Sequence, residues 1–406
     1  MIKRKKDHAR QNAEQIDLTA PQNEYYEAVS QRFGLAQVFL YLALLAFVAV
    51  SLLTNTNLIT YQNLYYFVKD LNATTERVDV LHSDAISYPT DVSQDFALYR
   101  QGLAVAGNTS VTVFTSTGRQ TVSRNVQYQN PVAVGTGKYL LVYELEGNQY
   151  SLYNSYTQIH TGKSSAPIRC ATMSPCGMYA VVTESEQYSS VVELYSNDFE
   201  LLGRYQYPDY VTDVAIDEKG NHLAILVSRV ENGSFTTEVE LYRTRSDQVS
   251  ARCELGDGLG LQCGFTSSED LAVLCGDGVY YVSVRGKLLT EASFDGQTLA
   301  AFDMTERGCV AVLKKNGNIL DHLIIVFDRG GKEVYRDEMK QNMQAVAMGN
   351  EEFFVMNSDG VVRIKTSGGE KTSLPCATDG RAMLALDDGR ILLCSPQRAV
   401  YYRFSS

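Results

Sequence analysis

The sequence predicts an all-β fold, a β-propeller, preceded by a single transmembrane helix near the N-terminus. Three observations support this prediction: a pattern of short strands repeats over most of the chain, one apolar segment is long enough to cross a bilayer, and the composition is that of a globular protein. The 406 residues are 45% hydrophobic and 20% charged, which is too apolar for a disordered chain.

The N-terminal part of the chain divides by charge. Residues 1–34 form a polar tail with six Lys or Arg and five Asp or Glu, whereas no charged residue occurs from Phe33 to Val68. Within this window the 19-residue segment Leu35–Leu53 is apolar except for Gln37 and Ser51. A helix of that length measures about 28 Å, close to the thickness of the hydrocarbon core. The segment is therefore predicted to be a transmembrane helix in contact with membrane lipid, with a buried core helix as the alternative.

The flanks of this segment predict its orientation. Four of the first six residues are Lys or Arg, and basic residues favour the cytoplasmic side of a membrane. The protein is then expected to be a single-pass protein of the cell membrane, with residues 1–34 in the cytoplasm and everything after Leu53 outside. A cleaved signal peptide is less favoured, because its apolar part is shorter and ends at a small-residue cleavage site.

Residues 54–74 are predicted to form a juxtamembrane segment. Apolar residues recur there at spacings of three and four, which places them on one face of a helix: Tyr61, Leu64, Tyr65, Val68 and Leu71. Aromatic rings of this kind are common at the headgroup level of a bilayer. A short helix on the outer leaflet and a segment packed beneath the following domain both fit this pattern.

From residue 75 onward, a unit of an apolar strand, a turn, a second apolar strand and a third strand repeats, most clearly at Cys170–Glu184 and Val214–Ser228. The second strands begin near Leu103, Tyr139, Met178, His222, Leu271, Cys309, Phe353 and Ile391. Third strands follow at Ser110–Arg119, Gln149–Ser155, Ser190–Ser196, Glu238–Thr244 and Leu323–Gly331. Eight starts over 288 residues give a step of about 41 residues, and a four-stranded repeat of that length is typical of propeller blades.

The last repeat has only three strands and ends at Ala399–Phe404. The segment Glu76–Leu81 is predicted to supply the fourth strand, because pairing the first and last strands closes the ring and removes exposed edges. Residues 75–406 are therefore expected to form one extracytoplasmic propeller with eight blades, and seven blades is the alternative.

One turn of the repeat carries a family resemblance. The segment Met173–Ala180, MSPCGMYA, resembles the turn-and-strand motif of WD40-like and TolB-like propellers, with Cys176 where Asp is usual. The tail, the span and the repeats together resemble the uncharacterised membrane-anchored, quinoprotein-like propeller proteins of Gram-positive bacteria. This resemblance implies an architecture. Quinone-dependent propellers resemble one another through tryptophan docking motifs, which a chain without Trp cannot contain, so no quinone cofactor is expected.

No recognisable catalytic or metal-binding motif occurs in the sequence. The five histidines are scattered without H-E-x-x-H, and there is neither a G-x-S-x-G nucleophile elbow nor a complete P-loop. The eight cysteines form no C-x-x-C pair and are predicted to be mainly buried free thiols, with a Cys170–Cys176 disulfide as the alternative. The net charge of −11 argues against nucleic-acid binding. No catalytic residue, cofactor or metal is therefore predicted.

These features predict a binding or scaffolding module at the cell envelope, with an envelope protein as its partner. Because the chain has no Trp, tyrosine is the aromatic residue available as a large binding anchor. The candidate contact residues lie in predicted loops: Tyr156, Tyr188, Tyr205, Tyr207 and Tyr210. Packing between blades is the alternative role for these rings. The alternative function is an envelope enzyme or ligand sensor with a site in the central channel, because residues donated by several blades leave no sequence motif.

Overall fold

The computed structural model of this protein describes residues 32–34, 36–47, 85–231, 233–267, 269–315, 320–376, 380–386 and 389–404. The chain divides into two compact units, Met1–Thr74 and Thr75–Ser406. In the first unit, residues 32–34 and 36–47 are helical. None of the helices within these described ranges is both long and apolar enough to span a bilayer. Residues 35 and 48–53 of the predicted span, the juxtamembrane segment 54–74 and the predicted strand Glu76–Leu81 lie outside the described residues.

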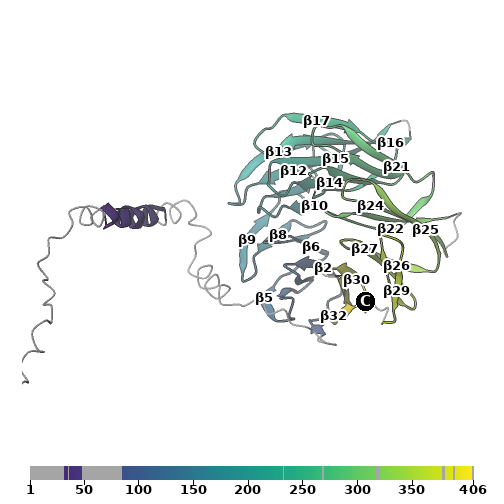
Figure 1. The fold of residues 1–406 in the computed structure, drawn as a ribbon. Helices are drawn as coiled ribbons and strands as arrows, with labels where there is room; N and C mark the ends of the chain where they lie inside the picture. The colour runs from purple at the N-terminus through teal and green to yellow at the C-terminus, as the bar shows by residue number, and fades with distance from the viewer. Residues whose placement is uncertain are drawn as a thin grey trace, which may run out of the picture. The chain divides into compact units, whose positions relative to one another are not determined.

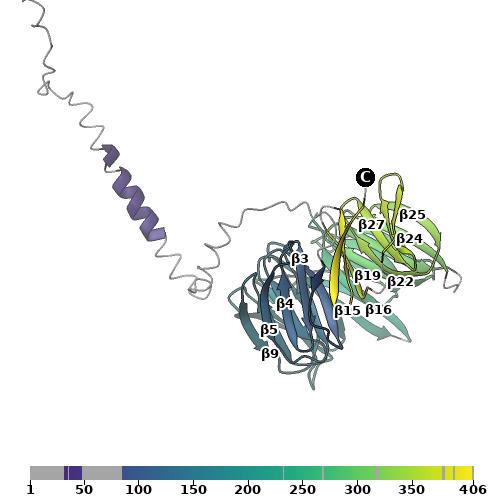
Figure 2. The same ribbon diagram turned by 90° about the horizontal axis from the view of Figure 1, so that it is seen from below.

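The second unit is a β-propeller whose described residues form eight four-stranded antiparallel sheets, arranged as blades (Figures 1 and 2). The predicted fold with eight blades is confirmed, and the alternative of seven blades is wrong. Blade 1 consists of β2 (Gln94–Tyr99), β3 (Gly102–Gly107), β4 (Ser110–Phe114) and β5 (Gln120–Asn125). Blade 2 consists of β6 (Pro131–Gly135), β7 (Leu140–Glu144), β8 (Gln149–Tyr153) and β9 (Gln158–Lys163). Blade 3 consists of β10 (Ile168–Met173), β11 (Tyr179–Thr183), β12 (Ser190–Tyr195) and β13 (Leu201–Tyr207).

The remaining blades follow the same order. Blade 4 consists of β14 (Tyr210–Ile216), β15 (His222–Glu231), β16 (Ser234–Arg243) and β17 (Val249–Glu254). Blade 5 consists of β18 (Gly260–Phe265), β19 (Leu271–Cys275), β20 (Gly278–Val282) and β21 (Leu288–Ser293). Blade 6 consists of β22 (Thr298–Thr305), β23 (Gly308–Lys314), β24 (Asp321–Asp328) and β25 (Glu333–Lys340). Blade 7 consists of β26 (Met343–Met348), β27 (Glu352–Asn357), β28 (Gly360–Lys365) and β29 (Lys371–Leu374). Blade 8 consists of β30 (Ala382–Ala385), β31 (Arg390–Cys394), β32 (Arg398–Arg403) and β1 (Ile86–Ser87).

The second strand of every blade begins within one residue of its predicted position. These strands were predictable because neighbouring blades cover both of their faces. Every residue of β3, β11 and β19, for example, is buried, so each of these strands is a continuous apolar run in the sequence. The outermost strands alternate instead, as β21 does with every second residue exposed. The five predicted third strands correspond to β4, β8, β12, β16 and β24.

The ring is closed by a strand from the N-terminal side, as predicted, but a different segment supplies it. β1 pairs antiparallel with β32, with Ile86 opposite Ala399. Ile86 is 3% exposed and belongs to the cluster that joins blade 8 to blade 1. The Tyr88 hydroxyl donates a hydrogen bond to the carbonyl of Ser395 at 2.6 Å. Among the described residues the closing strand is therefore Ile86–Ser87, while the predicted segment Glu76–Leu81 lies outside them.

The hydrophobic core is distributed around the ring. Each pair of neighbouring blades shares one cluster of buried residues, which gives eight clusters among the described residues. The first strands surround the centre of the ring and the fourth strands lie at its rim (Figure 1).

The antiparallel order of each blade creates two distinct faces of the disc. One face carries the links between blades and the turns between second and third strands, and we call it the link face. The opposite face carries the turns between first and second strands and between third and fourth strands, and we call it the turn face.

Candidate binding face

The hairpin of β15 and β16 extends beyond its neighbour on the link face. Both strands are ten residues long, whereas β19 and β20 of blade 5 have five residues each. Val230 pairs with Phe235 and Tyr210 pairs with Ser228, so these side chains share the face of blade 4 that packs against blade 5. Because blade 5 is shorter, Tyr210, Val230 and Phe235 are 65%, 60% and 42% exposed.

The base of this hairpin is fastened to blade 5 by two buried hydroxyl groups. Ser228 Oγ and Thr237 Oγ1 are 2.7 Å apart, and the backbone N–H of Gly260 donates to both, at 3.1 and 3.2 Å. Thr237 donates in turn to the carbonyl of Gly258 at 2.7 Å. The exposed end of the hairpin therefore projects from a fixed base.

A pocket of about 620 Å³ lies between blades 5 and 6 on the same face. Its apolar lining includes Leu259, Leu261 and Phe302, which are between 36% and 38% exposed. Leu259 and Leu261 flank Gly260, the residue that contacts the base of the hairpin. We call this cavity the link-face pocket. The link-face apolar surface consists of its exposed lining residues and the exposed residues of blade 4: Tyr210, Val230, Phe235, Leu259, Leu261 and Phe302.

The opposite side of the hairpin is charged. Arg229 forms ion pairs with Glu238, with Asp209 at 3.7 Å and with Glu231 at 3.8 Å. The end of the hairpin therefore has one apolar side, on the side of blade 5, and one polar side.

Three carboxylates on the innermost strands each join a blade to the next one. Each accepts a hydrogen bond from a backbone N–H: Asp95 from Ala133 at 2.8 Å, Asp213 from Cys263 at 2.8 Å and Asp303 from Met348 at 2.7 Å. Burial raises the pKa of all three carboxyl groups, and that of Asp213 reaches about 6.

A second cavity, of about 530 Å³, lies at the centre of the turn face. Its lining combines apolar residues such as Met173 and Met348 with the charged residues Asp303, Glu306 and Arg307. Throughout the described part of the chain, no three His, Cys, Asp or Glu side chains lie close enough together to hold a metal ion. Asp303 already accepts a hydrogen bond from blade 7, so its observed role in this cavity is to join two blades.

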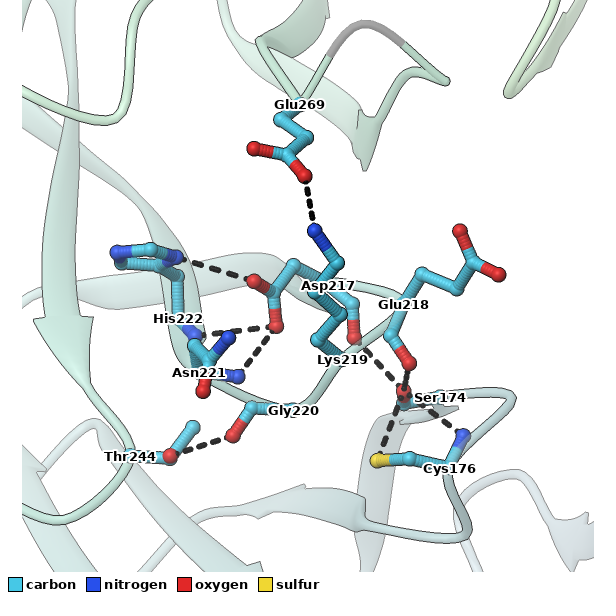
Figure 3. A network of polar contacts seen from close by, with 10 residues as sticks. All are labelled: Ser174, Cys176, Asp217, Glu218, Lys219, Gly220, Asn221, His222, Thr244 and Glu269. Carbon is cyan, nitrogen blue, oxygen red and sulfur yellow. Dashed lines mark hydrogen bonds and ion pairs between the residues drawn. The ribbon is translucent and has the colours of Figure 1, made fainter.

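A polar network on the turn face joins blade 3 to blade 4 (Figure 3). Ser174, in the turn after β10, donates from Oγ to the carbonyl of Asp217 at 2.7 Å. The Asp217 carboxylate accepts hydrogen bonds from the N–H groups of Asn221 and His222 at 2.5 and 3.1 Å, and it lies 3.0 Å from His222 Nδ1. His222 therefore shapes a turn.

The same turn packs closely against its neighbours. Gly220 has a φ of +71°, and a Cβ at this position would overlap the sulfur atoms of Cys176 and Met178 in blade 3. Lys219 forms an ion pair with Glu269 of blade 5 at 2.5 Å (Figure 3). The segment that resembles WD40-like propellers is thus a turn of the turn face, and Cys176 lies within its contacts to blade 4.

The structure separates the five predicted tyrosines by burial. Tyr205 and Tyr207 are 7% and 8% exposed and belong to the cluster between blades 3 and 4. Tyr156 and Tyr188 are half-buried. Tyr210 is 65% exposed and lies in the link-face apolar surface. Tyr205 and Tyr207 therefore pack between blades, which was the alternative to a role in partner binding.

The other residues of the link-face apolar surface were not identified from the sequence. Val230, Phe235, Leu259, Leu261 and Phe302 look like ordinary strand residues, because their exposure depends on the relative lengths of neighbouring blades. One signal was present: apolar alternation runs unusually far on both sides of Asn232-Gly233, a tight-turn sequence.

All eight cysteines are free and five of them are buried. The prediction of buried free thiols is confirmed for these five, and the alternative of a Cys170–Cys176 disulfide is wrong. Cys176 Sγ instead lies 3.2 Å from the hydroxyl of Ser174.

Known proteins agree with this architecture. Among solved structures, the chain is similar to the C-terminal WD40 domain of Sif2, with 10% identity and a TM-score of 0.57 over 79% of this chain and 97% of that one. It is similar to BamB from Moraxella catarrhalis, with 12% identity and a TM-score of 0.52 over 80% and 99% of the two chains. It is also similar to Sqt1 from Chaetomium thermophilum, solved bound to the N-terminus of the ribosomal protein L10, with 12% identity and a TM-score of 0.54 over 79% and 100%.

These likenesses confirm the WD40-like resemblance at the level of the fold, which is all that identities this low can show. No curated protein matches the chain significantly. Residues 72–398, which include almost the whole propeller, match a family described as a family of unknown function. The chain therefore belongs to that family, DUF5711.

Proposed function

We propose that this protein is a membrane-anchored binding module that holds a protein partner on the link face of its propeller, outside the cytoplasm. The observation that carries the proposal is the link-face apolar surface, where six large apolar side chains are exposed on neighbouring blades. Exposed apolar side chains gathered on one face of a protein mark interaction sites. A few large anchors, such as Tyr210 and Phe235, supply most of the binding energy in such interfaces.

The sequence of the first unit supports the membrane anchor. No charge occurs from Phe33 to Val68, and Leu35–Leu53 is long enough to cross the hydrocarbon core. Within the helical residues 36–47, Phe39 and Phe47 are 72% and 71% exposed. Exposed apolar rings of this kind are costly in water and favourable in lipid.

The charge pattern supports an external propeller. The basic residues that precede the apolar segment favour the cytoplasmic side, which leaves residues 75–406 outside. In this proposal the chain acts at the envelope of a Gram-positive bacterium, the setting of the proteins that its tail, span and repeats resemble.

Protease protection tests the orientation. Protease is added to intact cells from which the wall has been removed, and the products are detected with tags at either end. The propeller is expected to be digested, while the tag ahead of Lys3 persists on a short membrane-bound fragment. A protected propeller would overturn the external location.

Site-directed photo-crosslinking tests the binding face. A photoreactive amino acid replaces Phe235 in the full chain, expressed in its native membrane, and we expect one discrete adduct. The same group at Leu201, which is 53% exposed on the fourth strand of blade 3, is the matched control and should give no such adduct. Val230→Ser should weaken the adduct at position 235. Equal labelling from both positions would contradict a binding role for this face.

A further inference from the structure

Two residues that line the link-face pocket each carry a buried acceptor atom without a donor. Asp277 lies in the turn between β19 and β20, Gln297 lies in the link between blades 5 and 6, and both line the pocket. Among the described residues, neither Asp277 Oδ1 nor Gln297 Oε1 has a hydrogen-bond partner, although both atoms are buried. Buried polar atoms in folded proteins nearly always have a partner. The pocket is therefore short of donors.

The carboxylate of Asp277 is held in place by its surroundings. The Tyr280 hydroxyl donates to Asp277 Oδ2 at 3.0 Å. The loop that carries Gly256 and Gly258 packs against both carboxylate oxygens, since an added Cβ would overlap Oδ2 at Gly256 and Oδ1 at Gly258. This loop continues into Leu259, a lining residue of the pocket. The acceptor and the apolar lining are therefore positioned together.

Negative charge surrounds the pocket. Asp257 and Asp295 are exposed on the two links that flank it, and Glu254 is exposed at the end of β17. Among the basic residues at this end of blade 6, Lys314 lies opposite the lining residue Thr298, Lys315 forms an ion pair with Glu338, and Lys340 lies opposite Asp321. A positively charged group approaching the pocket is attracted by this excess of acids.

We propose that the link-face pocket receives a Lys or Arg side chain of the partner polypeptide. The aliphatic stem of that side chain lies against Leu261 and Phe302, and its charged end lies beside Asp277 and Gln297. Such a group brings a positive charge to the Asp277 carboxylate and apolar surface to the lining. The inference rests on the proposed function and specifies its partner, as a segment in which a basic residue stands among apolar ones.

A pair of defined peptides tests the inference on the full chain in detergent micelles. Both are fluorescein-labelled pentapeptides with a central residue flanked by leucines. The central residue is arginine in one and citrulline, its uncharged isostere, in the other. Fluorescence anisotropy is expected to show about tenfold tighter binding of the arginine peptide. Asp277→Asn should reduce this preference to about twofold or less, because the acceptor remains but the charge is lost.

Two further variants complete the experiment. Asp257→Asn removes an exposed acid of the link between blades 4 and 5 and should retain most of the preference. Leu261→Ser should weaken both peptides equally, because it removes apolar lining and no charge; it also tests the pocket if Asp277→Asn fails to fold. The inference is overturned if wild-type protein binds the two peptides equally or binds neither, or if the preference survives in folded Asp277→Asn. A persistent adduct from position 235 would then show that the proposed function stands without it.

Discussion

At the scale of single residues, buried hydrogen-bonded tyrosines link neighbouring strands and blades in a chain that has 26 Tyr and no Trp. The third strands of blades 3 and 4 both carry Glu-Leu-Tyr, ending at Tyr195 and Tyr242. Each tyrosine hydroxyl donates to the Glu two residues earlier, at 2.9 and 2.7 Å. Tyr207 of blade 3 joins the Glu240–Tyr242 pair of blade 4, because its hydroxyl also donates to Glu240, at 2.8 Å. The hydroxyl of a buried tyrosine usually has such a partner.

These networks show what could be predicted about individual residues. The repeated letters of Glu-Leu-Tyr are visible in the sequence, and so is the density of tyrosine around Tyr207 and Tyr210. Which ring is buried depends on the strand register, since Tyr207 ends one blade and Tyr210 begins the next. Local sequence cannot distinguish these two positions.

The two tyrosines should therefore respond differently to substitution. Tyr207→Ser removes a fully packed ring and a hydrogen-bond donor to Glu240, and should lower the free energy of unfolding by about 3–5 kcal/mol. Tyr210→Ser should change it by less than about 0.5 kcal/mol, because the ring is largely exposed. Denaturant unfolding of the full chain in detergent measures both values. Equal losses for the two variants would mean that the burial described above is incorrect.

The raised pKa of Asp213 predicts a pH dependence of stability. Its pKa is 3.8 in the unfolded chain and about 6 in the folded protein. Between these values the folded protein binds more protons, so stability falls as the pH rises from about 4 to 6 and is level above that range. Asp213→Asn keeps an acceptor for Cys263 and removes the titration. The variant should gain about 2–3 kcal/mol relative to wild type between pH 4 and 7.

Unfolding titrations at several pH values test this prediction, with Asp198→Asn on an exposed turn as the control. A constant difference between Asp213→Asn and wild type across the range would show that Asp213 does not titrate there.

At the scale of elements, the predictions from the sequence differ from the structure at short strands and at strand ends. The second strands were located within one residue because burial on both faces makes them apolar throughout. β1 has only two residues, too few for any periodicity, so the longer alternating segment Glu76–Leu81 was the better sequence candidate. The overhang of β15 and β16 is a difference in length between two blades, so the sequence around Asn232-Gly233 indicates a long hairpin but not which side chains it leaves exposed.

β1 should contribute to stability beyond its size. Ile86→Ser removes a side chain that is 3% exposed from the cluster between blades 8 and 1. We expect a loss of about 2–4 kcal/mol in the free energy of unfolding, together with faster hydrogen exchange at the backbone of Ala399. Val92→Ser, at a position that is 95% exposed, should alter neither. Unchanged exchange at Ala399 in Ile86→Ser would contradict the assignment of β1 as the closing strand.

At the scale of the whole molecule, eight clusters between blades take the place of one central core. The repeat length of about 41 residues was enough to predict this architecture, because each repeat must bury both faces against its neighbours. The link-face pocket could not be predicted in the same way. Its residues come from two blades and are separated in the chain, so only the assembled ring brings them together.

The propeller should fold without the first unit. All eight clusters are formed by residues of the second unit. Residues 72–406, produced alone, should be soluble, monomeric by light scattering and rich in β structure by circular dichroism. Their melting temperature should lie within a few degrees of that of the full chain. Aggregation of this fragment at micromolar concentration would show that the first unit is needed for folding.

The closure of the ring also determines how the molecule would respond to mechanical load. Tension applied through the chain ahead of Ile86 reaches the propeller at β1, a two-residue strand that pairs with the edge of β32. The next attachments along the chain are the hydroxyl of Tyr88, bonded to Ser395, and Asp91, whose carboxylate accepts a hydrogen bond from Thr109 at 2.9 Å. Pulling from this end would therefore peel the closing strand away first, opening one seam while the other seven still hold. In an optical trap, the first rupture should be a small extension at low force, well before the blades themselves unravel.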